Sequence, residues 1–273
     1  MKFKFLLLAV YSLTTLSIAQ SAQNLSELVM MLDSSGMNQR TEARNSIQQL
    51  FTSSTASTAD VNSRIVLEQE ALQLLQSELS HSAQVWLLRM LELTGSEASI
   101  PLIASYLNSP DTELRDCARR ALVANPAPEA NVVLYQAMLR ASDAEKRAYI
   151  DGFAFRGDAR AAKAIAPHLK SDDADTVIQA ANALALLGDS SVYSELNLAR
   201  TNAPDGSRAA IELAMLATGA DVSTCKSFIS SAANVGVAEA AFVALIKKDT
   251  TEAVSVLQAA VDEAPSPLRS AML

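Results

Sequence analysis

Apolar residues return at a fixed interval along much of this chain. Between residues 87 and 246, three columns of positions 31 residues apart contain no charged residue. The columns are Leu87, Ala118, Tyr149, Ala180, Ile211 and Phe242; Met90, Ala121, Gly152, Ala183, Ala214 and Leu245; and Leu91, Leu122, Phe153, Leu184, Met215 and Ile246. Positions that are three and four residues apart share one face of a helix. The pattern therefore predicts a helix that is repeated with a period of 31 residues.

A shorter helix is expected before each of these longer helices. It carries one apolar column, Ile103, Leu134, Ile165 and Leu196. Polar turns then predict the N-caps of the longer helices, at Ser109-Pro110-Asp111, Ser142-Asp143, Ser171-Asp172-Asp173 and Asp205. The repeats close at Gly95, Gly157, Gly188 and Gly219, with Pro126 in the remaining place. Glycine is favoured there because it adopts the left-handed conformation at a helix end without steric cost.

The start of the chain has the pattern of a secretory signal peptide. Lys2 and Lys4 precede an apolar run, and Ser17-Ile18-Ala19 places small residues before Gln20. A membrane anchor is the alternative, but it needs about 20 apolar residues. We predict a signal peptide at residues 1–19 and a protein exported to a periplasmic or extracellular location. No stable membrane insertion is expected once the signal is cleaved.

Residues 20–60 do not follow the 31-residue spacing. Two helical patterns, with Leu25, Leu28, Val29 and Leu32 and then Ala43, Ile47 and Leu50, flank a break at Ser34-Ser35-Gly36. Terminal repeats are often atypical, so this pair is predicted to be an N-terminal cap, followed by a Ser/Thr loop at residues 52–60.

The repeat array is predicted to cover residues 61–273. It begins with a helix over residues 64–79 that carries Ile65, Leu72, Leu75 and Leu79 on one stripe, and continues with a partner helix over residues 82–93. Ser266-Pro267 predicts a last helix that is incomplete and leaves Leu268, Ala271 and Met272 uncovered. Either another molecule packs against this end, or the sequence is the front part of a longer protein.

Charge and cysteine content narrow the classes of function. The net charge is −8, and it becomes −10 without Lys2 and Lys4. Nucleic acids and anionic lipids are therefore not expected as partners, because phosphate binding needs clustered basic residues. Cys117 and Cys225 are predicted to lie in different helices at least three repeats apart, too far for a disulfide. Two free, buried thiols are expected.

The segment from Ile100 to Leu122 resembles a HEAT repeat. The similarity lies in Ile100-Pro101-Leu102-Ile103, Tyr106-Leu107, Ser109-Pro110-Asp111, Leu114-Arg115, Ala118 and Ala121-Leu122. It is nearest to the short bacterial HEAT-like repeats that are also found in phycobilin lyases, an armadillo-type architecture. The resemblance implies an all-α fold, a right-handed α-solenoid of stacked antiparallel helix pairs with a period of 31 residues. It also implies structural roles for Asp111 and Arg115, with Lys146 and Arg208 in the arginine column.

No group of residues calls for an enzyme. His81 and His168 are far apart in sequence, and neither has a second His or a Cys nearby. The acidic run at residues 172–175 lacks the glycine and the distal glutamate of a calcium loop, so helix capping is the preferred interpretation. We find no glycine-rich phosphate loop, zinc motif or nucleophile elbow. No catalytic residue, metal site or cofactor is therefore predicted.

The longer helices carry a possible partner-binding ridge. Its members are the polar residues on the side away from the apolar columns: Asp116, Arg119, Arg120, Arg147, Asp151 and Asn182. Ile150, Ile178 and Ala181 interrupt the ridge. Residues 111–170 hold ten Lys or Arg against eight Asp or Glu, whereas residues 171–221 hold two against eight. This surface is either a groove that attracts partners of opposite charge or an ordinary solvated face.

Three hypotheses about function follow. The first is an exported, non-enzymatic scaffold that binds a protein partner or an adjoining domain along its longer helices, which line the concave side of HEAT-like arrays. The second is an accessory or lyase-like enzyme that handles a small ligand. The third is a structural spacer in a larger envelope protein.

Overall fold

A computed structural model describes residues 25–204, 206–231 and 234–263, and every regular element in these ranges is a helix. The chain divides into an N-terminal unit, up to residue 137, and a C-terminal unit, from residue 138 onward. After a first helical turn at residues 25–31, the α-helices are α2 (Met37–Ser54), α3 (Val61–Leu75), α4 (His81–Thr94), α5 (Ile100–Tyr106), α6 (Thr112–Ala124), α7 (Glu129–Arg140), α8 (Asp143–Arg156), α9 (Ala162–Ile165), α10 (Ala174–Leu187), α11 (Tyr193–Thr201), α12 (Arg208–Thr218), α13 (Val222–Ser231), α14 (Val235–Lys248) and α15 (Thr251–Glu263). Short 3₁₀ helices are η1 (Glu97–Ser99), η2 (Ala159–Ala161), η3 (Ala166–Lys170) and η4 (Ser190–Val192). The predicted all-α fold is confirmed for these residues.

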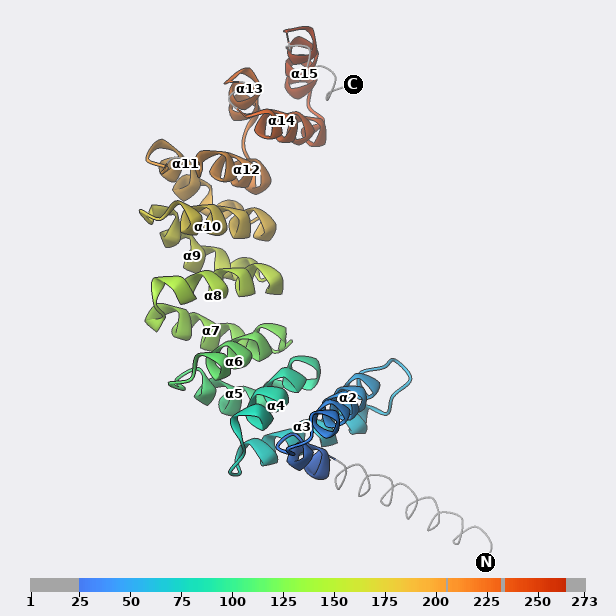
Figure 1. Cartoon of the computed structure of the whole chain (residues 1–273). Coiled ribbons are helices and arrows are strands. Elements are labelled where there is room, and N and C mark those ends of the chain that lie inside the picture. Colours follow the sequence, from blue (N-terminus) through green and yellow to red (C-terminus); the bar gives the residue numbers. More distant parts are fainter. Residues whose placement is uncertain (1–24, 205, 232–233, 264–273) are drawn as a thin grey trace, which may run out of the picture. The chain divides into compact units, whose positions relative to one another are not determined.

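In each unit, helix pairs stack through their second helices. In the N-terminal unit α4 packs against both α2 and α6, while α3 covers α4 and α5 covers α6. In the C-terminal unit the second helices follow one another as α8, α10, α12 and α14, as Figure 1 shows, and α11 and α13 cover α12 and α14. This is the arrangement of a helical-repeat protein.

The predicted apolar columns form the core for most of their length. Leu91, Leu122 and Leu184 are completely buried, and Phe153 and Met215 nearly so. The prediction is wrong at Ile246, whose side chain is 55% exposed. In α14 the spacing has slipped by one residue, so that Leu245 takes the buried place instead.

The N-caps show how far the repeat spacing extends. Asp111, Ser142 and Asp173 cap α6, α8 and α10, as predicted, and each follows the preceding cap in the series from Ser80 by 31 residues. Helix α12 begins later, with Ser207 at its N-cap. Arg208 is therefore the first residue of α12 and does not match Arg115, which lies four residues after its cap. A constant 31-residue period and the handedness of the array remain predictions.

The closing glycines are of two kinds. Gly157, Gly188 and Gly219 have φ values of 66°, 64° and 119°, so they end their helices in the left-handed conformation as predicted. Gly95 differs, because its φ is −54°. A Cβ at this position would lie 2.7 Å from the carbonyl oxygen of Leu91 and 3.3 Å from the side-chain nitrogen Nδ2 of Asn125. Close packing, and not backbone conformation, is what requires glycine there.

Near the N-terminus the sequence pattern misplaced two features. Helix α2 runs to Ser54, into the predicted loop, and buries Phe51 where Leu50 was expected. In α3 the buried stripe consists of Leu67, Glu68, Ala71 and Leu75, whereas Ile65 is 45% exposed. The Glu68 carboxylate is buried because it holds the turn after α4, accepting a hydrogen bond from the Ser96 N–H at 2.6 Å.

Several predicted features lie outside the described residues. They are the signal peptide at residues 1–19, the cap residue Asp205 and the last helix that begins at Ser266. None of the helices that the structure describes has the length and apolar character needed to span a membrane.

Candidate functional site

The structure places the predicted ridge residues on the second helices but divides them into two kinds. Asp116 and Arg120 are exposed on α6, and Asp151 and Asn182 are exposed on α8 and α10. The column that holds Arg119 is different. The Arg119 side chain is only 16% exposed and its guanidinium lies 2.6 Å from the Asp116 carboxylate.

The residues that follow Arg119 in this column are fully buried. Ile150 and Ala181 have no exposed surface. They do not interrupt a ridge, as the sequence suggested, because they lie in the core beneath it. The exposed surface therefore consists of the two flanking columns, those of Asp116 with Arg147 and of Arg120 with Asp151 and Asn182.

In the N-terminal unit, ion pairs bridge the seam between α4 and α6. The Arg89 guanidinium lies 3.2 Å from the Glu113 carboxylate, and Arg120 lies 3.0 Å from Glu92. At the end of the seam, His81 Nε2 lies 3.1 Å from Asp111 Oδ2. Opposite charges thus face each other across this pair of helices.

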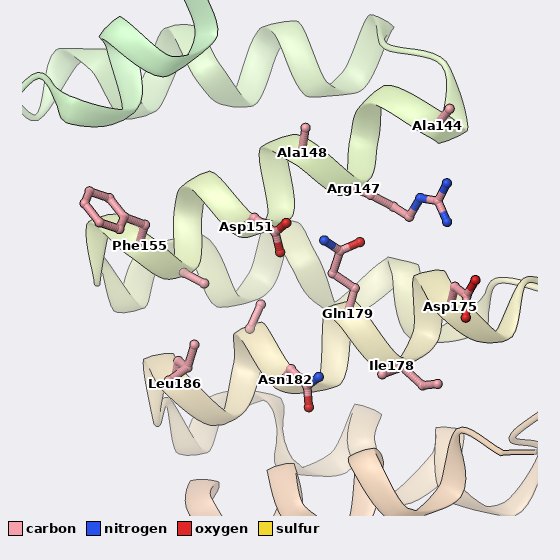
Figure 2. Close-up of a pocket in the computed structure, with 12 residues that line it drawn as sticks. Ala144, Arg147, Ala148, Asp151, Phe155, Asp175, Ile178, Gln179, Asn182 and Leu186 are labelled. Carbon is pink, nitrogen blue, oxygen red and sulfur yellow. The ribbon is translucent and has the colours of Figure 1, made fainter. Parts of the chain in front are cut away.

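In the C-terminal unit, the corresponding seam between α8 and α10 is an open groove of ≈ 820 Å³. It brings together three predicted residues, Arg147, Asp151 and Asn182 (Figure 2). The other lining residues are mostly apolar: Ala144, Ala148, Ala154, Phe155, Asp175, Ile178, Gln179, Ala183 and Leu186.

Counting from the N-caps explains why this seam is open. Nine residues after their caps, α4 and α6 carry Arg89 and Arg120, whereas α8 and α10 carry Asp151 and Asn182. The acids that pair with the two arginines, Glu113 and Glu92, have Asp175 and Ala154 as their counterparts. One ion pair is thereby replaced by two acids, and the other by an amide and a small apolar residue.

The two ends of the groove differ in chemistry. Where α8 and α10 end, Phe155 and Leu186 are 79% and 76% exposed (Figure 2). Where the two helices begin, Arg147 lies 3.7 Å from the Asp173 carboxylate. Sequence reasoning found Arg147 but missed Phe155 and Leu186, both of which lie thirteen residues after an N-cap. Aligning the helices by their caps would have revealed them.

A smaller pocket of ≈ 340 Å³ adjoins the groove at Arg147. Its other lining residues are Ala144, Lys146, Pro167, His168, Lys170, Ser171, Asp173 and Thr176. Asp173 accepts hydrogen bonds from the Thr176 hydroxyl at 2.6 Å and the Thr176 N–H at 3.2 Å, so capping of α10 is confirmed for this part of the acidic run.

The predicted structural pair Asp111 and Arg115 stabilises the start of α6. Asp111 accepts from the Leu114 N–H, while Arg115 donates to the carbonyl oxygens of Ser109 and Pro110 at 2.9 and 3.1 Å. Arg40 makes the same contacts with the carbonyl oxygens of Ser34 and Ser35 at the start of α2. The sequence did not reveal this recurrence because α2 lies off the 31-residue spacing.

Reactive side chains are few in the described residues. Cys117 and Cys225 are free and buried, as predicted, and burial raises the pKa of both thiols. No cluster of three or more His, Cys, Asp or Glu residues that could hold a metal ion occurs within the part of the chain that the structure describes.

Comparison with known proteins bears on the fold alone. No protein-family model and no curated protein matches the sequence. Among solved structures, similarity is found to the complex of CpcE and CpcF of phycocyanin lyase from Nostoc sp. PCC7120, with 16% identity, coverage of 91% of this chain and 94% of that chain, and a TM-score of 0.42. An engineered protein is 18% identical, with 91% and 76% covered and a TM-score of 0.47.

A third similar structure, with a higher TM-score than these two, is a homology model of the full-length AP-3 complex in an intermediate open conformation. It has a TM-score of 0.54 at 12% identity, and it covers 93% of this chain but 50% of that chain. At such low identity the likeness supports the fold and carries no information about activity.

Proposed function

We propose that this protein is an exported, non-enzymatic helical-repeat scaffold that binds a protein partner or an adjoining domain through the exposed face of its second helices. The observation that supports this function is the groove between α8 and α10, an open and mostly apolar seam with Phe155 and Leu186 at one end. Exposed aromatic and large aliphatic side chains beside a few polar groups are typical of protein interaction sites.

The groove has the character of a contact surface more than of a reaction site. Its titratable lining residues are Arg147, Asp151 and Asp175, and it contains no histidine or cysteine. A lyase-like enzyme that holds a small ligand and a structural spacer remain the alternatives.

Site-specific photo-crosslinking tests the proposal. A photoreactive amino acid is placed at Gln179, in the groove, and in a control protein at Asn197, which is exposed on α11 in the other layer of the same unit. The expected result, in the cells that produce the protein, is one adduct of defined mass from position 179 and none from position 197. Equal labelling at both positions, or no adduct, would contradict the proposal.

Two further measurements separate the alternatives. Saturable binding of a small molecule by the purified protein, without a protein adduct, would favour the lyase-like function. Export is tested by mass spectrometry of the mature protein, which is expected to begin at Gln20. A mature chain that retains residues 1–19 would contradict signal cleavage.

A further inference from the structure

The groove contains acidic side chains that the protein itself does not neutralise. Asp151 on α8 and Asp175 on α10 form no ion pair or side-chain hydrogen bond with any residue in the described ranges. In the N-terminal unit, Arg89 and Arg120 occupy the positions that correspond to Asp151 and Asn182. Each of these arginines forms an ion pair with a glutamate across the seam between α4 and α6. The seam between α8 and α10 keeps one acid of these ion pairs, Asp175 in the place of Glu113, and has neither arginine.

Arg147 does not neutralise Asp151 or Asp175. Its guanidinium is directed toward Asp173, at 3.7 Å, and Asp173 is also the N-cap of α10. The groove lining therefore contains two acids and one base, and that base already has an acidic neighbour outside the groove. An acidic lining favours a partner that carries positive charge.

Apolar surface lies close to one of these acids, Asp151. Asp151 and Phe155 are four residues apart on α8, which corresponds to about 6 Å along the helix axis. Leu186 on α10 lies at the same end of the groove as Phe155 (Figure 2). A rise of about 6 Å matches about two residues of extended chain, and side chains two residues apart point to the same side of such a chain.

We infer that the groove binds a segment of a protein partner that places a lysine or arginine side chain against Asp151 and a large apolar side chain against Phe155 and Leu186, while Asp175 adds negative charge where α10 begins. The partner thus supplies the cation that Arg89 and Arg120 supply between α4 and α6. This inference rests on the proposed function, since it names the chemistry of the partner at the same groove.

Peptide selection tests this chemistry. Short random peptides displayed on phage are selected against the purified protein. The expected winners carry Lys or Arg with a large apolar residue about two positions away. The best peptide is then labelled with a fluorophore, and its affinity is measured by anisotropy for each protein variant.

Three variants decide the result. Asp151→Asn combined with Asp175→Asn is expected to weaken the peptide about tenfold, and Asp151→Arg is expected to do so as well, because its own guanidinium would occupy the site. Arg147→Gln is expected to strengthen binding about twofold, since it removes a like charge. The matched control, Asp172→Asn with Glu195→Gln, removes two exposed acids of the same unit that do not line the groove and is expected to leave affinity unchanged.

The possible failures are distinguishable. If the selected peptides are acidic, or bind equally to the Asp151/Asp175 variant and the control, the inference about charge is wrong and the binding function stands. If no peptide is selected and position 179 yields no adduct, the proposed function fails as well. Circular dichroism of each variant separates loss of binding from loss of folding.

Discussion

The seams α4/α6 and α8/α10 are built on the same core but have opposite surfaces. Under both, a leucine of the shared apolar column is fully buried, Leu122 in α6 and Leu184 in α10. Above it, the pairs Arg89–Glu113 and Arg120–Glu92 bridge the first seam, and the second is an open groove. The packing face is thus kept while the outer face varies, which is how a repeat fold can present different surfaces on identical supports.

Truncating the buried leucine under each seam tests whether the two cores are equivalent, and this change has the largest expected effect. Leu122→Ala and Leu184→Ala should each lower the free energy of unfolding by about 2–5 kcal/mol, because each leaves a cavity in a packed interior. Chemical denaturation would measure both losses. Leu186→Ala, at a site that is 76% exposed, is the control and should stay within about 0.5 kcal/mol of the parent protein. A small loss at either buried leucine would show that the two cores differ.

The ion pairs are expected to contribute less. A double-mutant cycle with Glu92→Gln and Arg120→Gln should give a coupling energy of about 0.2–1 kcal/mol, since Arg120 is half exposed. The coupling should fall as salt is added, because exposed charges are screened.

The same cycle applied to the groove sharpens the comparison. Asp151→Asn and Asp175→Asn occupy the places of Arg89 and Glu113, the other ion pair of the first seam, and should show no stabilising coupling. A stabilising coupling of similar size in the groove would contradict the distinction between a seam bridged by ion pairs and an open one.

Acid titration of the caps should show the smallest effect. The Leu114 N–H, followed by His81, lowers the pKa of Asp111, and the Thr176 hydroxyl lowers the pKa of Asp173. A pKa that folding lowers means that the ionised carboxylate stabilises the fold. The contribution is complete above the unfolded-chain pKa of about 3.9 and is lost as the pH falls through the folded-state pKa.

Asparagine variants reveal this contribution, because asparagine still caps a helix but does not titrate in this range. The stability difference between the parent and Asp111→Asn, or Asp173→Asn, should be largest above pH of about 4 and shrink at lower pH. Denaturation at a series of pH values measures it. A difference that stays constant as the pH falls would contradict the assigned hydrogen bonds.

Prediction from the sequence succeeded where the local pattern and the packing coincide. Leu122, Phe153 and Leu184 follow helical spacing and are buried, and Asp111 and Asp173 precede helices that they cap. It failed at Ile246 and at Arg208, where a cap moved and the spacing slipped. A constant period cannot detect such a shift, because apolar residues stand at both the old and the new positions.

The candidate site was predicted in part. Arg147, Asp151 and Asn182 were identified as exposed residues of second helices, and the structure brings them into one groove. Ile150 was placed on the same surface but is buried, because the apolar face of α8, which packs against α10, is wider than one stripe.

By itself, the sequence determined that this chain is helical, where most of its helices begin and which residues form the core, since spacing and capping are local properties. Only the tertiary structure decided that ion pairs bridge one seam and that the other is an open groove. That outcome depends on which side chains face each other across neighbouring helices, about 24 to 28 residues apart in the chain, and no local pattern records such pairing.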